Sequence, residues 1–109
     1  MNHVTGEALQ ISVGADDERA RVVALAGDVD FGTGAAVLDC VRDLTQRGSD
    51  VIIDLSDARY MDSAGLAALV GARRAAARSG RAFTVRNPPR FIARVLAASG
   101  IDRLVDVEW

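Results

Sequence analysis

The 109-residue sequence predicts an α/β domain with a mixed, mostly parallel sheet of about five strands packed with helices. Short alternating or β-branched apolar segments recur along the chain, and after the second of them they alternate with segments of helical periodicity. A short polar turn joins the first two strand-like segments, whereas helices join the later ones, so the first pair should be antiparallel and the rest parallel. No repeat or linker interrupts residues 1–109, so we expect one domain, with residues 1–7 as a loose tail.

Five segments have the composition of strands. The first two flank the polar turn Gly14 to Glu18 and should form a hairpin. The third is a β-branched run between turn residues, which is typical of a central strand buried on both faces. The last is a short candidate edge strand. The segments are 9–13, 21–25, 51–55, 82–85 and 104–107.

Three segments have the apolar spacing of amphipathic helices, and each is followed by a glycine that should end it. Thr33 is a candidate cap for the first helix, and Pro88-Pro89 opens the third. Asp62-Ser63 stands where the second begins. The expected inward residues are Val37, Cys40, Val41 and Leu44 in the first, Leu66, Leu69, Val70 and Ala77 in the second, and Phe91, Ile92, Val95 and Leu96 in the third; the stops are Gly48, Gly80 and Gly100.

The charge and cysteine content exclude several classes of protein. A formal net charge of −2 provides no basic field for nucleic acid, and no apolar run approaches the ~20 residues of a membrane helix. With one cysteine and no signal-peptide pattern, we expect a cytoplasmic protein.

All thirteen basic residues are Arg, and seven of them lie between Asp62 and Asp102, where no acidic residue occurs. A solvated helix face explains this stretch more simply than a patch for an acidic partner.

Two loops should lie at the carboxyl ends of the strands, where ligands and partners of such sheets bind: Gly27 to Phe31 and Tyr60 to Leu66. In the second loop, Ser63 has two possible roles. Its hydroxyl could cap the helix, worth about 1 kcal/mol, or it could carry a phosphate at the positive end of the helix dipole. Local physics favours the cap.

The string Tyr60-Met61-Asp62-Ser63-Ala64-Gly65-Leu66 after the strand 51–55 resembles the phosphorylation motif of STAS domains, specifically the SpoIIAA-like anti-sigma factor antagonists. Gly27-Asp28-Val29-Asp30 is similar to the family's Gly-acid-aliphatic-Asp loop. The segment from Pro88 to Ile101 is similar to its closing helix and Ser-Gly-Ile turn. The resemblance extends from about residue 9 to residue 107. It departs at Ala64, where many relatives have a second serine.

The resemblance implies a switch in partner exchange. The unmodified protein would bind an anti-sigma factor with serine kinase activity and so release a sigma factor, and phosphorylation of Ser63 would separate the pair. A serine phosphatase would reset the cycle. The residues expected to bind the partner are Gly27, Asp28, Asp30, Asp62, Ser63, Ala64 and Gly65. The alternative within the same fold is an accessory or scaffold subunit of a transporter or of a stress-sensing complex.

An enzyme is the main rival class. Ser63 lacks the Gly-x-Ser-x-Gly elbow, the only histidine is His3 in the expected tail, and the absence of lysine excludes a Gly-Lys phosphate loop. We therefore expect no catalytic residue and no cofactor. One His and one Cys are too few for a metal site built from these ligands, and carboxylates in turns are usually caps or solvated groups. Cys40 should be a buried, inert thiol.

Overall fold

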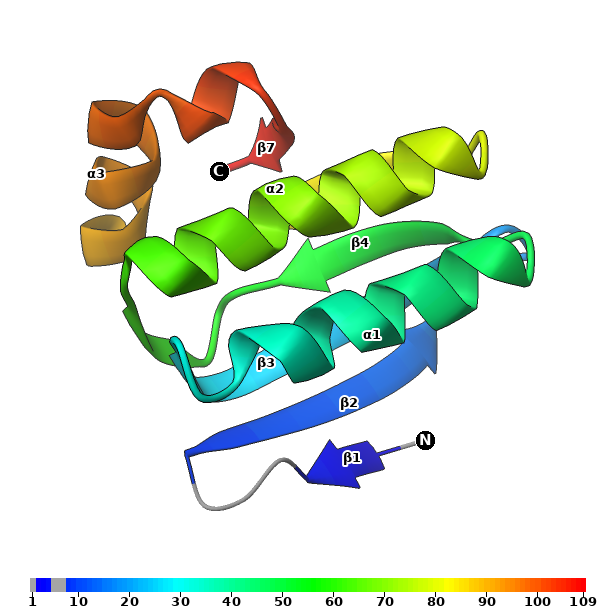
Figure 1. Cartoon of the computed structure of the whole chain (residues 1–109), viewed down its shortest axis with the longest axis horizontal. Helices are drawn as coiled ribbons and strands as arrows, with labels where there is room; N and C mark the ends of the chain where they lie inside the picture. Colours follow the sequence, from blue (N-terminus) through cyan, green and yellow to red (C-terminus); the bar gives the residue numbers. More distant parts are fainter. Residues whose placement is uncertain (1, 5–7) are drawn as a thin grey trace.

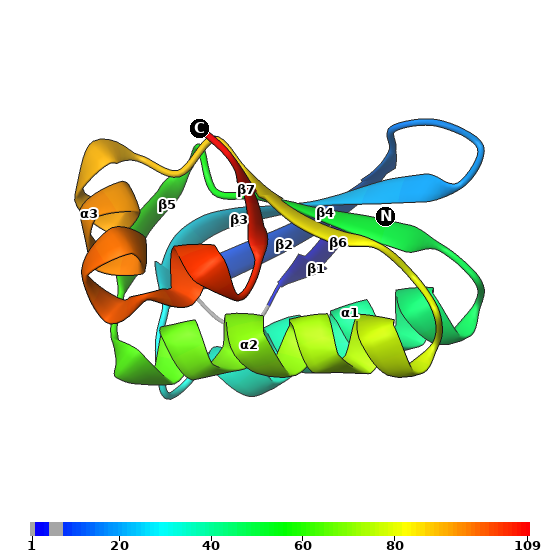
Figure 2. The same ribbon diagram turned by 90° about the horizontal axis from the view of Figure 1, so that it is seen from above.

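The computed structural model describes residues 2–4 and 8–109 and shows two layers, a twisted sheet and a pair of helices on one of its faces. Helices α1 (Gly34–Gln46) and α2 (Ser63–Arg78) lie side by side on that face, as Figure 2 shows. Helix α3 (Arg90–Ser99) lies at the end of the sheet where the central strand terminates (Figure 1). The opposite face of the sheet carries no helix among the described residues. The core therefore lies between the sheet and the α1–α2 pair.

The sheet is mixed and mostly parallel, which confirms the predicted fold class. Strand β2 (Leu9–Ala15) pairs antiparallel with β3 (Ala20–Val29), and β4 (Asp50–Asp54) and β6 (Phe83–Arg86) follow in parallel. The central strand β4 has Val51, Ile52 and Ile53 buried, as its composition predicts. The short edge strand near the C-terminus is β7 (Asp106–Glu108), and it pairs parallel with β6.

The described residues form seven strands rather than about five. Strand β1 (Asn2–Val4) pairs antiparallel with β2, so the expected tail is wrong for these three residues; residues 1 and 5–7 of that tail lie outside the described residues. Strand β5 (Ala58–Met61) occupies a segment that the sequence shows only as a connection. It pairs parallel with the last residues of β3, beyond the point where β4 stops. A four-residue strand is too short for its alternation to be recognised.

The three helices end where the sequence predicts. Gly48 and Gly80 follow α1 and α2, and Gly100 takes a left-handed conformation, with φ of 79°, at the end of α3. Two inward positions are wrong: Ala77 and Phe91 are exposed, and Ala76 is buried instead of Ala77. None of the helices in the described part of the chain is long and apolar enough to cross a membrane.

Cys40 is only half-buried at the edge of the core, so the expectation of a fully buried thiol is wrong in extent. Burial still raises the pKa of the Cys40 thiol, and the nearby carboxylate of Asp43 raises this pKa further. Both effects disfavour the thiolate, which is the reactive form.

Strand β3 contains an irregularity at Gly27. The predicted strand, 21–25, ends before this residue, whereas the observed strand continues to Val29. The register between β3 and β5 shifts between Gly27 and Asp28, and Gly27 has φ of 122°. A Cβ at this position would collide with the carbonyl oxygen of Ala8 and would lie 3.2 Å from the Cα of Leu9. Glycine therefore allows β3 to bend here and to continue alongside β5.

We predict that Gly27→Ala lowers the free energy of unfolding by about 2–4 kcal/mol, because alanine adds both backbone strain and a collision with the backbone of residue 8. Urea denaturation of both variants measures the effect. Gly14→Ala is the matched control, since a Cβ there meets nothing within 4 Å. An equal loss in both variants would contradict the assignment.

Candidate functional site

The site forms where the start of α2 packs against the end of β3. A Cβ on Gly65 would collide with the carbonyl oxygen of Val29 and would lie 2.9 Å from Cγ of Met61. The amide of Asp62 donates to the same Val29 carbonyl at 3.4 Å. Only glycine permits this approach of helix to strand, so the beginning of α2 is held at the carboxyl end of β3.

Asp62, and not Ser63, caps α2. The Oδ1 atom of Asp62 accepts a hydrogen bond from the amide of Gly65 at 2.9 Å, and its carbonyl accepts one from Leu66 at 3.0 Å. Ser63 is the first helical residue and is exposed. Within the described residues, the Ser63 hydroxyl has no hydrogen-bond partner, and the amides of Ser63 and Ala64 have no acceptor. The hydroxyl is therefore free for modification, and the first-turn donors beside it are free as well.

The loop between β3 and α1 is closed by a network around Thr33. The Thr33 hydroxyl donates to the carbonyl of Asp28 at 2.8 Å and accepts from the amide of Asp30 at 2.9 Å. The carboxylate of Asp30 accepts from the amide of Gly32 at 2.9 Å. Thr33 stands at the cap position of α1, but its side chain makes no cap hydrogen bond, so the expected cap is wrong. The hydroxyl closes the preceding turn instead.

The two predicted loops lie next to each other. A Cβ on Gly34, the first residue of α1, would lie 3.2 Å from Cβ of Ala68 and 3.6 Å from the carbonyl oxygen of Ala64. This contact joins the first turn of α1 to the first turns of α2. The structure thus brings the β3–α1 loop and the Ser63 turn to one surface, the carboxyl edge, which comprises residues 28–34 and 60–65. Gly27 stands just before this edge, within β3.

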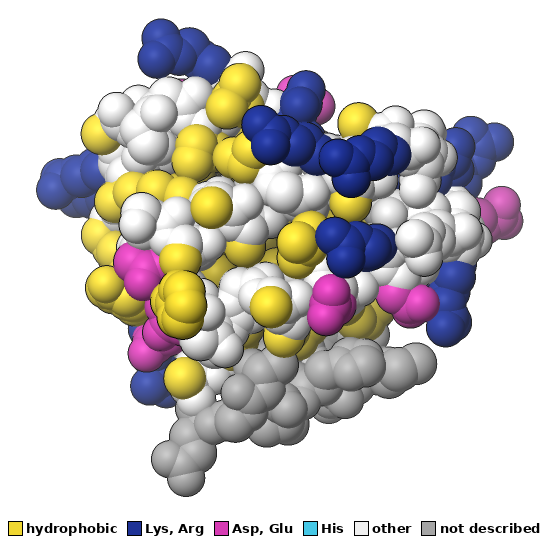
Figure 3. All heavy atoms as spheres, in the orientation of Figure 1, with side chains coloured by type: hydrophobic (Ala, Val, Ile, Leu, Met, Phe, Trp, Pro, Cys, Tyr) yellow, Lys and Arg dark blue, Asp and Glu magenta, His cyan; other side chains and the backbone are white. Residues whose placement is uncertain are grey.

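Two large apolar side chains are exposed on the carboxyl edge. Phe31 is 89% exposed at the tip of the β3–α1 loop, and Tyr60 is 50% exposed on β5. Figure 3 shows hydrophobic and acidic side chains together at the left-hand end of the molecule, where the parallel strands finish. The carboxylates of Asp28, Asp30 and Asp62 belong to this edge. Exposed aromatic side chains are enriched at protein-binding surfaces.

Phe31, Thr33 and Gly34 belong to this site, although the sequence pattern did not predict them as site residues. Two signals in the sequence could have identified them. Phe31 is a lone aromatic residue in a polar turn, and Asp30 stands three residues before Thr33. No group of three or more potential metal ligands occurs among the side chains of residues 8–109, which are the ones that the structure describes. Among the described groups, the carboxylates of the carboxyl edge act as caps and turn acceptors or face solvent.

We predict that Asp62→Ala lowers the free energy of unfolding by about 1 kcal/mol, because the amide of Gly65 loses its acceptor. Asp62→Asn should restore most of the stability, since asparagine caps helices equally well. Ser63→Ala should change stability by less than about 0.5 kcal/mol, because its hydroxyl bonds to nothing. Urea unfolding of the three variants tests this assignment. A Ser63→Ala loss as large as that of Asp62→Ala would show that the serine is the cap.

Comparison with known proteins identifies relatives of this chain. The chain is 27% identical over 85 residues to the anti-sigma-B factor antagonist of Bacillus subtilis, covering 78% of each protein. An anti-sigma factor antagonist from Mycobacterium paratuberculosis superimposes with a TM-score of 0.80 at 20% identity, over 93% of this chain and 86% of that one. The Bacillus cell fate determinant SpoIIAA in its phosphorylated form superimposes with a TM-score of 0.69 at 17% identity, over 91% of both chains.

A family model described as "Mlab, STAS domain" matches residues 12–106, which include nearly the whole sheet, all three helices and the carboxyl edge. The sheet topology and the Asp62-Ser63 turn agree with the resemblance on which the sequence prediction rested. The chain belongs to the STAS domain family.

Proposed function

We propose that this protein is an anti-sigma factor antagonist whose partner binding is switched off by phosphorylation of Ser63. In this proposal the unmodified chain binds an anti-sigma factor with serine kinase activity in the bacterial cytoplasm and so releases a sigma factor. A serine phosphatase restores the binding form. The observation that carries the proposal is the exposed, unbonded Ser63 hydroxyl at the first position of α2. The similarity to the Bacillus subtilis antagonist supports the class of partner.

The position of Ser63 allows a phosphate without loss of the fold. Because Asp62 already caps α2, modification of Ser63 removes no hydrogen bond from the native structure. A phosphate there lies at the positive end of the helix dipole, worth about 0.3–1 kcal/mol when exposed. The free amides of Ser63 and Ala64 are donors of the kind that bind phosphate at helix N-termini. The phosphorylated protein should thus remain folded.

Binding responds differently because the carboxyl edge is already acidic. Phosphate adds about −1.5 to −2 charges at neutral pH, next to Asp62 in the sequence and on the same edge of the molecule as Asp30. A partner surface packed against the neutral serine would have to bury this charge without a compensating cation, which costs several kcal/mol. Each 1.4 kcal/mol is a tenfold loss of affinity. A fold that tolerates the phosphate and a partner surface that is repelled by it together make partner binding reversible.

The partner-binding surface in this proposal is the carboxyl edge together with Gly27. Asp62, Ser63, Ala64 and Gly65 form the switch turn, and Asp28 and Asp30 flank it from the neighbouring loop. Phe31 supplies the exposed apolar anchor that such interfaces use. Binding and release need no chemistry by this chain, so the proposed role is regulatory and not enzymatic.

The alternative is an accessory subunit of a transporter or of a stress-sensing complex. Affinity capture from a lysate of the source organism, with unmodified protein and with Ser63→Glu as baits, separates the two. A histidine-kinase-like ATPase retained only by the unmodified bait would support the antagonist. A transporter ATPase would support the alternative.

We predict that Ser63→Glu weakens binding of the anti-sigma factor at least about tenfold, whereas Ser63→Ala binds like the parent and is not phosphorylated by it. Both variants should melt within a few degrees of the parent protein, because the Ser63 hydroxyl has no native partner. Titration calorimetry and thermal melts measure the two effects.

Ser79→Glu is the matched control, since it places the same charge on an exposed residue at the other end of α2. Its affinity should equal that of the parent. The switch mechanism is wrong if Ser63→Glu binds as tightly as the parent, or if Ser79→Glu weakens binding equally.

We predict further that Phe31→Ala lowers the affinity for the same partner at least about tenfold, because aromatic anchors dominate interface energetics. Its stability should change by less than about 0.5 kcal/mol, since the ring is 89% exposed. Leu104→Ala is the control, because Leu104 is also exposed but lies beside β7. Unchanged affinity of Phe31→Ala in calorimetry would remove Phe31 from the interface.

A further inference from the structure

A series of unburied residues runs along the outer side of α2, away from the sheet. It begins at Ser63 and continues with Ala67, Val70, Arg74 and Ala77, in alternating steps of four and three residues. These steps are the spacing of the residues that meet a second helix in a coiled coil. At about 1.5 Å per residue, the series is roughly 21 Å long, the length of a helix of about four turns. We call these five residues the α2 stripe.

Three arginines belong to the second half of this face. Arg74 lies in the α2 stripe, and Arg73 and Arg78 stand directly beside it, at the positions where charged residues select the partner in coiled coils. All three side chains are exposed, and none has a hydrogen-bond or ion-pair partner among the described residues. Figure 3 shows arginine side chains gathered over this part of α2.

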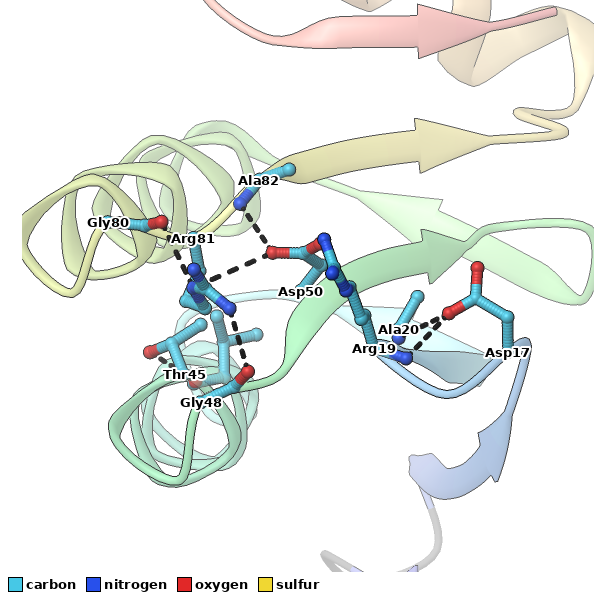
Figure 4. A network of polar contacts seen from close by, with 10 residues as sticks. Asp17, Arg19, Ala20, Thr45, Gly48, Asp50, Gly80, Arg81 and Ala82 are labelled. Atoms are coloured by element: carbon cyan, nitrogen blue, oxygen red, sulfur yellow. Dashed lines mark hydrogen bonds and ion pairs between the residues drawn. The ribbon is translucent and has the colours of Figure 1, made fainter.

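Other arginines near the two helices are paired. On α1, Arg42 and Arg47 each lie near an aspartate one helical turn away, at 3.6 and 3.2 Å. Arg81, just beyond α2, is held as Figure 4 shows: its Nη1 donates to the carbonyl of Gly48 at 3.0 Å, and its Nε lies 3.7 Å from Oδ1 of Asp50. No such acid is available within α2, because residues 63–81 contain no Asp or Glu.

The unpaired charges of α2 repel one another. Arg74 and Arg78 are four residues apart, a spacing at which like charges destabilise a helix. Carboxylates from outside the chain would remove this repulsion, and guanidinium groups pair with carboxylates in a favourable geometry. A second copy of α2 would not supply them, because it would bring further arginines to the same surface. The occupant that complements this face is therefore acidic.

The shape of the same face suits a helix. Ala67 and Ala77 are exposed and Val70 is half-buried, so the side chains along the α2 stripe are short and partly apolar. A Cβ on Gly71 would lie 3.6 Å from Cδ1 of Leu38, so α1 follows α2 closely on one side of the stripe. Short side chains allow another helix to pack at an interaxial distance of about 8–10 Å.

We propose that an acidic amphipathic helix of the partner lies along the α2 stripe, with its apolar side on Ala67 and Val70 and its carboxylates on Arg73, Arg74 and Arg78. The proposal rests on the proposed function, since it names the part of the anti-sigma factor that this chain recognises. The composition of the sequence favours solvation of these arginines. Their lack of partners on one side of a single helix favours an acidic partner instead.

The α2 stripe also connects this helix to the proposed switch. Ser63 is the first residue of the stripe, so a helix of about four turns docked along it reaches the Ser63 hydroxyl. The carboxylates that pair with the arginines at one end would be repelled by a phosphate at the other end. A single acidic helix would thus be attracted to unmodified α2 and released from the phosphorylated form.

The probe is the anti-sigma factor that the unmodified chain retains in the capture experiment, and its binding kinetics are measured by surface plasmon resonance at two salt concentrations. Arg74→Glu and Arg78→Glu should each weaken binding at least about tenfold, mainly through slower association, and should reduce its salt dependence. Arg94→Glu is the matched control, because Arg94 is an exposed, unpaired arginine of the described residues on α3. It should bind within about twofold of the parent.

Thermal melts keep the test free of folding effects. All three variants should melt like the parent, because none of these guanidinium groups has a partner within the described chain. Parent-like binding by both Arg74→Glu and Arg78→Glu would overturn the proposal, and so would an equal loss of affinity in Arg94→Glu.

Hydrogen exchange of the anti-sigma factor, with and without this chain, identifies the docked segment. The protected segment should include a helix with Asp or Glu beside an apolar stripe. Protection confined to segments without acidic residues would overturn the proposal. Binding of the chain to phosphatidylglycerol vesicles that Arg74→Glu abolishes, with unchanged binding of the anti-sigma factor, would assign the α2 stripe to a membrane instead.

Ser63→Glu in the same measurement separates this proposal from the function on which it rests. If Ser63→Glu binds weakly while Arg74→Glu and Arg78→Glu bind like the parent, the α2 stripe alone is wrong. If Ser63→Glu binds like the parent while both arginine variants bind weakly, the phosphorylation switch alone is wrong. Absence of an anti-sigma factor from the captured proteins would overturn both.

Discussion

The contact between Gly65 and the carbonyl of Val29 is the constraint on which the site depends. Because residue 65 has no Cβ, the first turn of α2 can touch the backbone at the end of β3. This close approach fixes the position of the first turn of α2 relative to the end of β3. It also places Ser63 at the rim of the molecule, beside the loop that begins at Asp30. A side chain at residue 65 would push the helix outward and would open the carboxyl edge.

The capping arrangement separates the stability of the fold from the chemistry of the proposed switch. Asp62 caps α2 by accepting from the amide of Gly65, so the Ser63 side chain contributes no hydrogen bond to the native state. Because the Ser63 side chain makes no hydrogen bond, a change in its charge should have little effect on the stability of the fold. The adjacent loop is equally well determined, since Thr33 closes it through Asp28 and Asp30. The carboxyl edge thus presents a defined surface, on which the proposed switch would add one charged group.

The charges of the molecule are distributed unevenly along α2. Its first turn adjoins the acidic carboxyl edge, whereas its second half carries Arg73, Arg74 and Arg78. The arginines that face solvent there contribute little individually to stability. Their concentration on one side of the molecule creates a local positive potential. The two ends of one helix therefore differ in the charge of their surroundings.

The sequence by itself determined the α/β class, the three helices with the glycines that end them, and the start of α2 at Asp62-Ser63. Hydrophobic periodicity, helix-ending glycines and capping residues are local signals, which can be recognised without the tertiary structure. The tertiary structure decided which of these two residues is the cap, since both Asp and Ser serve that role and only packing against β3 selects one. It also decided that β3 bends at Gly27 and pairs with β5, because a four-residue strand acquires its identity from its neighbour. The exposure of Phe31 was likewise undetermined, because a phenylalanine in a turn is buried or exposed according to residues distant in the chain.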